Sequence, residues 1–246
     1  MKNRQNIFET GEYYHLYSRG NSKQDIFLDD HDRKRFTKLL YLCNSTKNIN
    51  FRDNIVNENI EAWDFDRGRR ILSVGAWVMM SNHFHLYVKC LDNSESPMSD
   101  IGNNGISMFM RKLLTSYVKY FNKKYERTGG LFEGKFKSVH ITDDNQAKYL
   151  FSYNHFNPVK IIDSNWKKNG IRDQKKVLDF LDGYRWSSYS DFKEVKRPEN
   201  KIINSNDFPE YFSDVKIFDQ EIFDWLSYNL PMSDIGQREL NPHIVL

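Results

Sequence analysis

Hydrophobic and polar residues alternate with different periods along this 246-residue chain, and the spacing predicts a mixture of strands and helices. Residues 12–19 and 71–89 are rich in Tyr, Val and Trp, which is typical of strands, and the second stretch is long enough for a strand or a hairpin. Residues 33–43 and 106–125 carry apolar side chains at helical spacing. Residues 143–156 begin with acids and end before a proline, so we expect a third helix there. Residues 131–141 alternate in part and predict a further strand.

The connections between these elements are polar. Residues 44–70 form a long excursion rich in Asn and Asp, and residues 91–105 are expected to be a loop. Residues 160–183 form a polar connection with a short helix at 174–181, and residues 184–189 are expected to pack back on the domain. The last part of the chain holds one amphipathic, acidic helix. We therefore expect one domain over residues 1–190 and an acidic extension over residues 191–246.

The formal net charge of +3 is too small to identify a partner, but its distribution is uneven. Residues 107–137 hold eight Lys and Arg against two Glu, whereas residues 207–239 hold eight Asp and Glu against two cations. Aromatic residues make up 15% of the chain, and several lie among the basic ones. This pattern favours a basic middle region that binds a polyanion, in particular single-stranded nucleic acid.

The N-terminal residues and the cysteines indicate the cellular compartment. Charged residues interrupt any apolar core in the first thirty residues, and no stretch of the sequence is apolar enough to predict a transmembrane helix. The two cysteines form no CxxC pair, so neither a zinc ribbon nor a disulfide framework is expected. A reducing cytoplasm fits these features best.

His83 and His85 stand two residues apart in the stretch VMMSNHFHLYVK. Residues two apart in a strand point to the same face, so the two imidazoles project side by side while Phe84 points into a core. Because neutral imidazole is the commonest metal ligand, the pair suits one divalent metal ion. The pattern is short, and two surface histidines on an edge strand would produce it too. His15, on the first strand, could approach the same site.

Tyr153 and Asn157 are four residues apart on a predicted helix, which puts both side chains on one face. If that face opposes the His pair, Asn157 supplies an oxygen ligand and Tyr153 points its hydroxyl at the metal. Two imidazoles and one amide oxygen leave coordination sites open, which suits Mg²⁺ or Mn²⁺ with substrate and water. His155 should point away from this face, so we expect a structural role for it. Tyr153 taken alone is more simply an aromatic residue on a helix face.

Five separated sequence motifs follow one another between residues 12 and 189. They are YYHLYSRGNSKQDIF, VMMSNHFHLYV, SMFMRKLLTSYVKYFNKKYERTGGLFEGKFKS, YLFSYNHFNPVK and YRWSSY. In this combination the chain resembles the REP-associated tyrosine transposases, which belong to the HUH single-tyrosine transposases of bacterial insertion sequences. The sequence departs from the family at Ser81, where proline is frequent, and at Asn157, where many relatives have glutamine.

The resemblance implies an α+β fold with the HUH endonuclease core, a ferredoxin-like antiparallel sheet that has helices on one side. The helical acidic extension follows this core. It implies that His83, His85 and Asn157 are metal ligands and that Tyr153 is the nucleophile. The implied reaction is cleavage of single-stranded DNA near a REP-like hairpin through a 5′-phosphotyrosine, followed by strand transfer. It also implies a monomer, with a dimer as the alternative, in the cytoplasm and associated with the nucleoid.

DNA binding in this interpretation depends mainly on the basic middle region and on the first turn. The candidate residues are Arg19, Lys23, Arg111, Lys119, Lys123, Lys124, Lys135 and Lys137. Each lysine alone could equally be a solvated surface charge. Two other functions stay open: a domesticated hairpin-binding protein with little turnover, and a metallo-phosphoesterase that uses water and forms no covalent adduct. The acidic extension could cover the basic region or recruit a partner.

Overall fold

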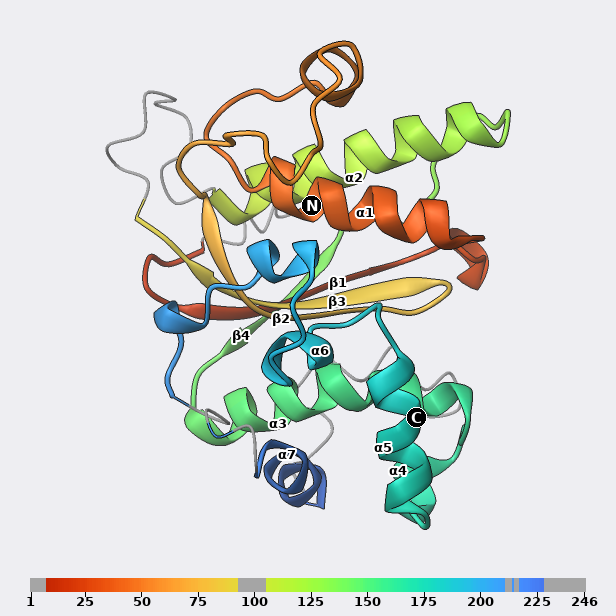
Figure 1. The fold of residues 1–246 in the computed structure, drawn as a ribbon, viewed down its shortest axis with the longest axis vertical. Coiled ribbons are helices and arrows are strands. Elements are labelled where there is room, and N and C mark those ends of the chain that lie inside the picture. The colour runs from red at the N-terminus through yellow and green to blue at the C-terminus, as the bar shows by residue number, and fades with distance from the viewer. Residues whose placement is uncertain (1–7, 93–104, 211–213, 215–216, 228–246) are drawn as a thin grey trace, which may run out of the picture.

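A computed structural model describes residues 8–92, 105–210, 214 and 217–227 (Figure 1). Its centre is a four-stranded antiparallel sheet of β1 (Tyr13–Arg19), β2 (Leu72–Met79), β3 (His83–Cys90) and β4 (Lys137–Ile141). The strand order is β2-β3-β1-β4. Helix α1 (Asp30–Cys43) lies between β1 and β2 in the sequence, and α2 (Gly105–Lys124) lies between β3 and β4. This succession is ferredoxin-like, so the predicted α+β fold is confirmed.

Helices cover both faces of the sheet (Figure 1). The two helices of the ferredoxin-like unit, α1 and α2, lie on one side, as predicted. Helices α3 (Asp144–Phe156) and α7 (Phe218–Ser227) lie on the other side, a second layer that the one-sided prediction did not include. Period-two alternation along β3 explains the two layers, because Phe84 and Leu86 belong to the core under α1 and α2, whereas Tyr87 belongs to the core under α3.

The remaining described elements are short. They are η1 (Asn21–Lys23), the π-helix η2 (Arg52–Val56), η4 (Asn157–Ile161), α4 (Trp166–Asn169), α5 (Gln174–Gly183), α6 (Tyr189–Phe192), η5 (Pro198–Ile202) and η6 (Ser205–Asp207). None of the helices in the described ranges has the length and apolar character needed to span a bilayer.

Side-chain caps fix the starts of two helices. Asp29 accepts a hydrogen bond from the backbone N–H of Asp32 at 2.9 Å and forms a capping box at the start of α1. Asp143 accepts from the backbone N–H of Gln146 at 2.9 Å at the start of α3. The strand predicted over residues 131–141 is shorter than expected. Gly134, at φ +66, interrupts it, and regular pairing begins at Lys137.

The chain after α5 returns to the outer edge of β2. The backbone N–H of Met79 donates to the carbonyl of Trp186 at 2.9 Å, and that of Asn204 donates to the carbonyl of Val74 at 2.9 Å. Gly75 lies directly under Phe208, where a Cβ atom would stand 2.7 Å from the ring. Described residues on both sides of position 190 therefore contact this sheet. The domain boundary placed there stays a prediction, and the loop expected over residues 91–105 lies mostly outside the described residues.

Candidate active site

Strand register brings His85 beside Tyr17 of β1, and Tyr17 beside Lys137 of β4. Arg19 and His83 are paired in the same way one step further along. Paired residues in an antiparallel sheet project from the same face, so β4, β1 and β3 present a row of cationic, aromatic and imidazole side chains to one side. This is the face that α3 covers (Figure 1).

The contacts of His83 favour one tautomer of its neutral ring. Its Nδ1 lies 2.6 Å from Oδ1 of Asn82, and the Asn82 amide is oriented because its Nδ2 donates to the carbonyl of Lys23 at 3.2 Å. An amide oxygen only accepts, so the ring proton is on Nδ1. The lone pair of His83 is therefore on Nε2, as required of a nitrogen that ligates a metal.

His85 is buried and lies against a second buried histidine. Its Nδ1 is 2.8 Å from Nε2 of His15, and their rings stack at 5.0 Å between centroids. One of the two nitrogens donates and the other accepts. If His85 donates through Nδ1, the lone pair of His85 is on Nε2. This confirms that His15 approaches the site, and the contact resembles the outer-shell partners that orient metal-ligating histidines.

Helix α3 places Tyr153 over the histidines. The Tyr153 ring meets the His85 ring edge to face at 5.5 Å between centroids, and His85 meets His83 in the same manner at 5.1 Å. Tyr153 is only 2% exposed. Burial, and then the neighbouring Tyr149, raise the pKa of the Tyr153 phenol, while a hydrogen bond with the Asn157 side chain opposes that rise.

Asn157 is buried at the end of α3, one turn after Tyr153. The helix thus brings the Tyr153 phenol to the face that carries His83 and His85, and the Asn157 side chain reaches this face through its hydrogen bond with Tyr153. Across the described ranges, His, Cys, Asp and Glu form no group of three or more that could hold a metal ion. Two imidazoles and an amide oxygen are still ligand types that suit a divalent cation with several sites for water and substrate, because the tautomer of His83 places a lone pair on Nε2.

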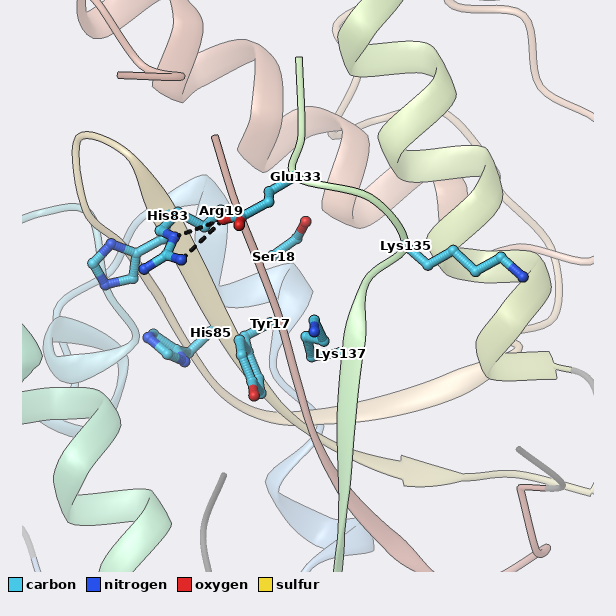
Figure 2. Close-up of a pocket in the computed structure, with 8 residues that line it drawn as sticks. All are labelled: Tyr17, Ser18, Arg19, His83, His85, Glu133, Lys135 and Lys137. Carbon is cyan, nitrogen blue, oxygen red and sulfur yellow. Dashed lines mark hydrogen bonds and ion pairs between the residues drawn. The ribbon is translucent and has the colours of Figure 1, made fainter. Parts of the chain in front are cut away.

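A small cavity of about 60 Å³ opens beside the histidines (Figure 2). Its lining includes His83 and His85 together with three predicted DNA-binding residues, Arg19, Lys135 and Lys137. Arg19 forms an ion pair with Glu133 at 2.9 Å, drawn as dashed lines in Figure 2. A phosphate group in this cavity would meet imidazole and cationic side chains together.

The other predicted DNA-binding residues lie elsewhere. Lys23 is exposed in the turn after β1, and Arg111 is exposed on α2. Lys119, Lys123 and Lys124 line a separate groove on the α1–α2 side of the sheet. The basic middle region is therefore divided between the two faces of the molecule.

Sequence reasoning missed Asn82 and Glu133, which hold His83 and Arg19 through side-chain contacts. Asn82 was adjacent to the His pair and could have been proposed as its partner. Glu133 lies 114 residues from Arg19, so only the folded chain reveals the contact. His155 is fully buried and bonds Ser188 Oγ through Nε2 at 2.7 Å, consistent with the structural role predicted for it.

Comparisons with known proteins give a likeness at the level of structure but not of sequence. No protein-family profile matches the sequence, and no curated protein matches it either. A solved structure described as the REP-associated tyrosine transposase bound to a REP hairpin is similar over 81% of this chain and 90% of that chain. The sequence identity is 11% and the TM-score is 0.43. A similarity of this size concerns backbone arrangement and does not transfer the activity of that protein to this chain.

Proposed function

We propose that this protein is a metal-dependent endonuclease and strand transferase that acts on single-stranded DNA near hairpins, with Tyr153 as nucleophile. One observation carries the proposal: Tyr153 on α3 packs against His85, in the face that also carries His83 and the cations of the small cavity. These residues come from distant parts of the sequence. The candidate nucleophile contacts a candidate metal ligand, and the two histidines in turn line the cavity that holds the cations.

The proposed reaction replaces one phosphate ester by another. The phenol oxygen of Tyr153 bonds to phosphorus, the bond from phosphorus to O3′ breaks, and the phenol proton passes through solvent to the departing 3′ oxygen. A divalent ion, Mg²⁺ or Mn²⁺, held by His83, His85 and Asn157 would polarise the phosphodiester and offset its developing charge. A 3′ hydroxyl that attacks the phosphotyrosine reverses the exchange and joins DNA strands.

The chain's own residues divide the remaining work. Lys137 holds the phosphate from β4, and Arg19 holds it from β1, where Glu133 fixes the guanidinium. The side chain of Lys135 points away from the histidines (Figure 2), so it takes no part in this contact. Tyr153 is buried and its pKa is raised, so its phenolate is disfavoured in this conformation. Cleavage therefore requires a local movement that exposes the hydroxyl to the phosphodiester.

The test is a denaturing gel with labelled single-stranded hairpin DNA from beside the gene, with Mn²⁺ or Mg²⁺ and with chelator. Tyr153→Phe is compared with Tyr149→Phe, a matched control one turn earlier on α3, whose ring stacks with Tyr153 at 6.4 Å between centroids. We expect a metal-dependent covalent adduct in the wild type and in Tyr149→Phe, and none in Tyr153→Phe.

Each other outcome refutes the tyrosine mechanism. Cleavage that survives in Tyr153→Phe without an adduct identifies a metallo-phosphoesterase that uses water. Tight binding without cleavage, over several hairpins and both metals, identifies a DNA-binding protein without turnover.

A further inference from the structure

A second basic surface lies on the side of the sheet away from the His pair. Helices α1 and α2 and the segment 49–56 enclose a groove of about 780 Å³. Its lining contains five cations and no acidic residue: Arg35, Arg52, Lys119, Lys123 and Lys124. Figure 1 shows α1 and α2 above the sheet and α3 below it, so the sheet separates this groove from the candidate active site.

Four of these cations are available to a ligand. Lys124 is neutralised by Asp29 and Asp32, at 2.7 and 2.8 Å. Within the described part of the chain, no carboxylate forms an ion pair with Arg35, Arg52, Lys119 or Lys123. Concentrated positive charge without acidic partners produces a local potential that attracts anions.

Arg35 is held in a position suited to an oxyanion that accepts two hydrogen bonds from the guanidinium, as a phosphate does. Its guanidinium carbon lies 3.6 Å from the centre of the Phe51 ring and 4.7 Å from that of Tyr120. Tyr120 is itself fixed, because its hydroxyl donates to Asp32 at 2.9 Å. Partial burial lowers the pKa of Arg35, which reflects the cost of desolvating its charge. An anion bound at the edge of this stacked guanidinium would offset that cost.

We propose that this groove binds the phosphodiester backbone of single-stranded DNA, at a site distinct from the one that cleaves it. Cations along a groove would contact successive phosphates, and the exposed Val56 and the edges of Phe51 and Tyr120 provide apolar surface for bases. The choice of DNA as the polyanion rests on the proposed function. The groove itself does not, because its charge and stacked arginine stand without Tyr153. DNA in this groove would flank the nucleotides at the active site.

The test measures fluorescence anisotropy of labelled single-stranded DNA of increasing length over a range of salt concentrations. The variants are Arg35→Gln and the double variant Lys119→Gln/Lys123→Gln. Lys34→Gln is the matched control, since Lys34 is an exposed cation of α1 outside the groove. For long DNA, the slope of log affinity against log salt should fall by about 0.7 for each phosphate contact removed. Short DNA that spans only the cleavage site should bind these variants as it binds the wild type.

Thermal melting of each variant separates lost binding from lost folding, and the double variant alters only exposed side chains. Wild-type affinity and slope in both groove variants would overturn the proposal. An equal loss in Lys34→Gln would also overturn it, because the effect would then be one of total charge. Polyglutamate that competes as well as unlabelled DNA would mean that the groove accepts any polyanion. If Tyr153→Phe keeps cleaving while the groove variants lose long DNA, the nuclease mechanism fails and the groove assignment stands.

Discussion

Replacement of Lys124 by methionine should destabilise the fold more than it weakens DNA binding. Lys124 Nζ lies 2.7 Å from Asp29 and 2.8 Å from Asp32, whose carboxylate is fully buried. Burial opposes the charged form of Lys124, but hydrogen bonds to the two carboxylates outweigh it and raise its pKa. Lys124 therefore acts mainly as the counter-ion of a buried acid, and any contribution to the proposed phosphate binding is secondary.

The magnitude follows from what remains around Asp32 in the variant. The carboxylate would still accept from the hydroxyls of Tyr120 and Tyr125, at 2.9 and 2.8 Å, and from the backbone N–H of Leu28 at 2.8 Å. Loss of one charged partner with the others kept should cost about 2 kcal/mol, less than for an entirely uncompensated buried charge. For a chain of this size, that corresponds to a fall in Tm of about 4–8 °C.

Lys123→Met is the matched control, because Lys123 is the adjacent exposed lysine in the same groove. Its effect on unfolding should stay within about 0.5 kcal/mol, as for ordinary surface positions, while its affinity for long single-stranded DNA falls. Both variants are measured by thermal denaturation and by DNA titration. Equal Tm values for Lys124→Met and the wild type, or a greater loss of stability in Lys123→Met, would refute the assignment of Lys124 to the Asp32 network.

Three further predictions concern buried polar groups. Asn44→Ala should cost about 3 kcal/mol in urea denaturation, since Asn44 bonds the backbone of Ile71 and Leu72 through three contacts of 2.9, 2.9 and 3.0 Å; a loss under about 1 kcal/mol would contradict this reasoning. Burial lowers the pKa of His155 from 6.5 in the unfolded chain to about 3 in the folded protein. The neutral imidazole therefore stabilises the fold fully above the unfolded pKa, and this stabilisation is lost as the pH falls from 6.5 towards 3. The wild type should therefore lose up to about 1.4 kcal/mol per pH unit more than His155→Gln between pH 6 and 4, and parallel stability curves would disprove it. If His15 orients His85, His15→Ala should lower Mn²⁺ affinity by calorimetry about 10–100-fold, a claim that fails if affinity is unchanged while His83→Ala abolishes binding.

Local patterns predicted the elements that carry the candidate site. Period two placed His83 and His85 on one face of β3, and the acids at residues 143 and 144 marked the start of the helix that carries Tyr153. The same rule applied to β1 would have added Tyr17 and Arg19 to the face of His15. These features depend on neighbours within a few residues.

The division of the basic residues could not be predicted in this way. Lys119 and Lys135 are close in sequence, yet the chain passes from the helical layer to the sheet between them. Charge counted along the sequence cannot separate two faces of a fold. The basic groove beside α1 and α2 is completed by Arg35 of α1 and Phe51 of the polar excursion that follows it. The stacking of these two side chains depends on tertiary packing.

The return of the chain along β2 limits how copies of this protein can associate. A bare outer strand offers unpaired backbone groups to the strand of another molecule. Here the carbonyls of Val74 and Trp77 already accept from Asn204 and Ser188 of the same chain, at 2.9 and 2.8 Å. Sheet extension between two molecules at this edge would first have to displace that segment. The opposite edge is β4, and a strand added there would lie beside Lys137, which lines the small cavity next to the histidines.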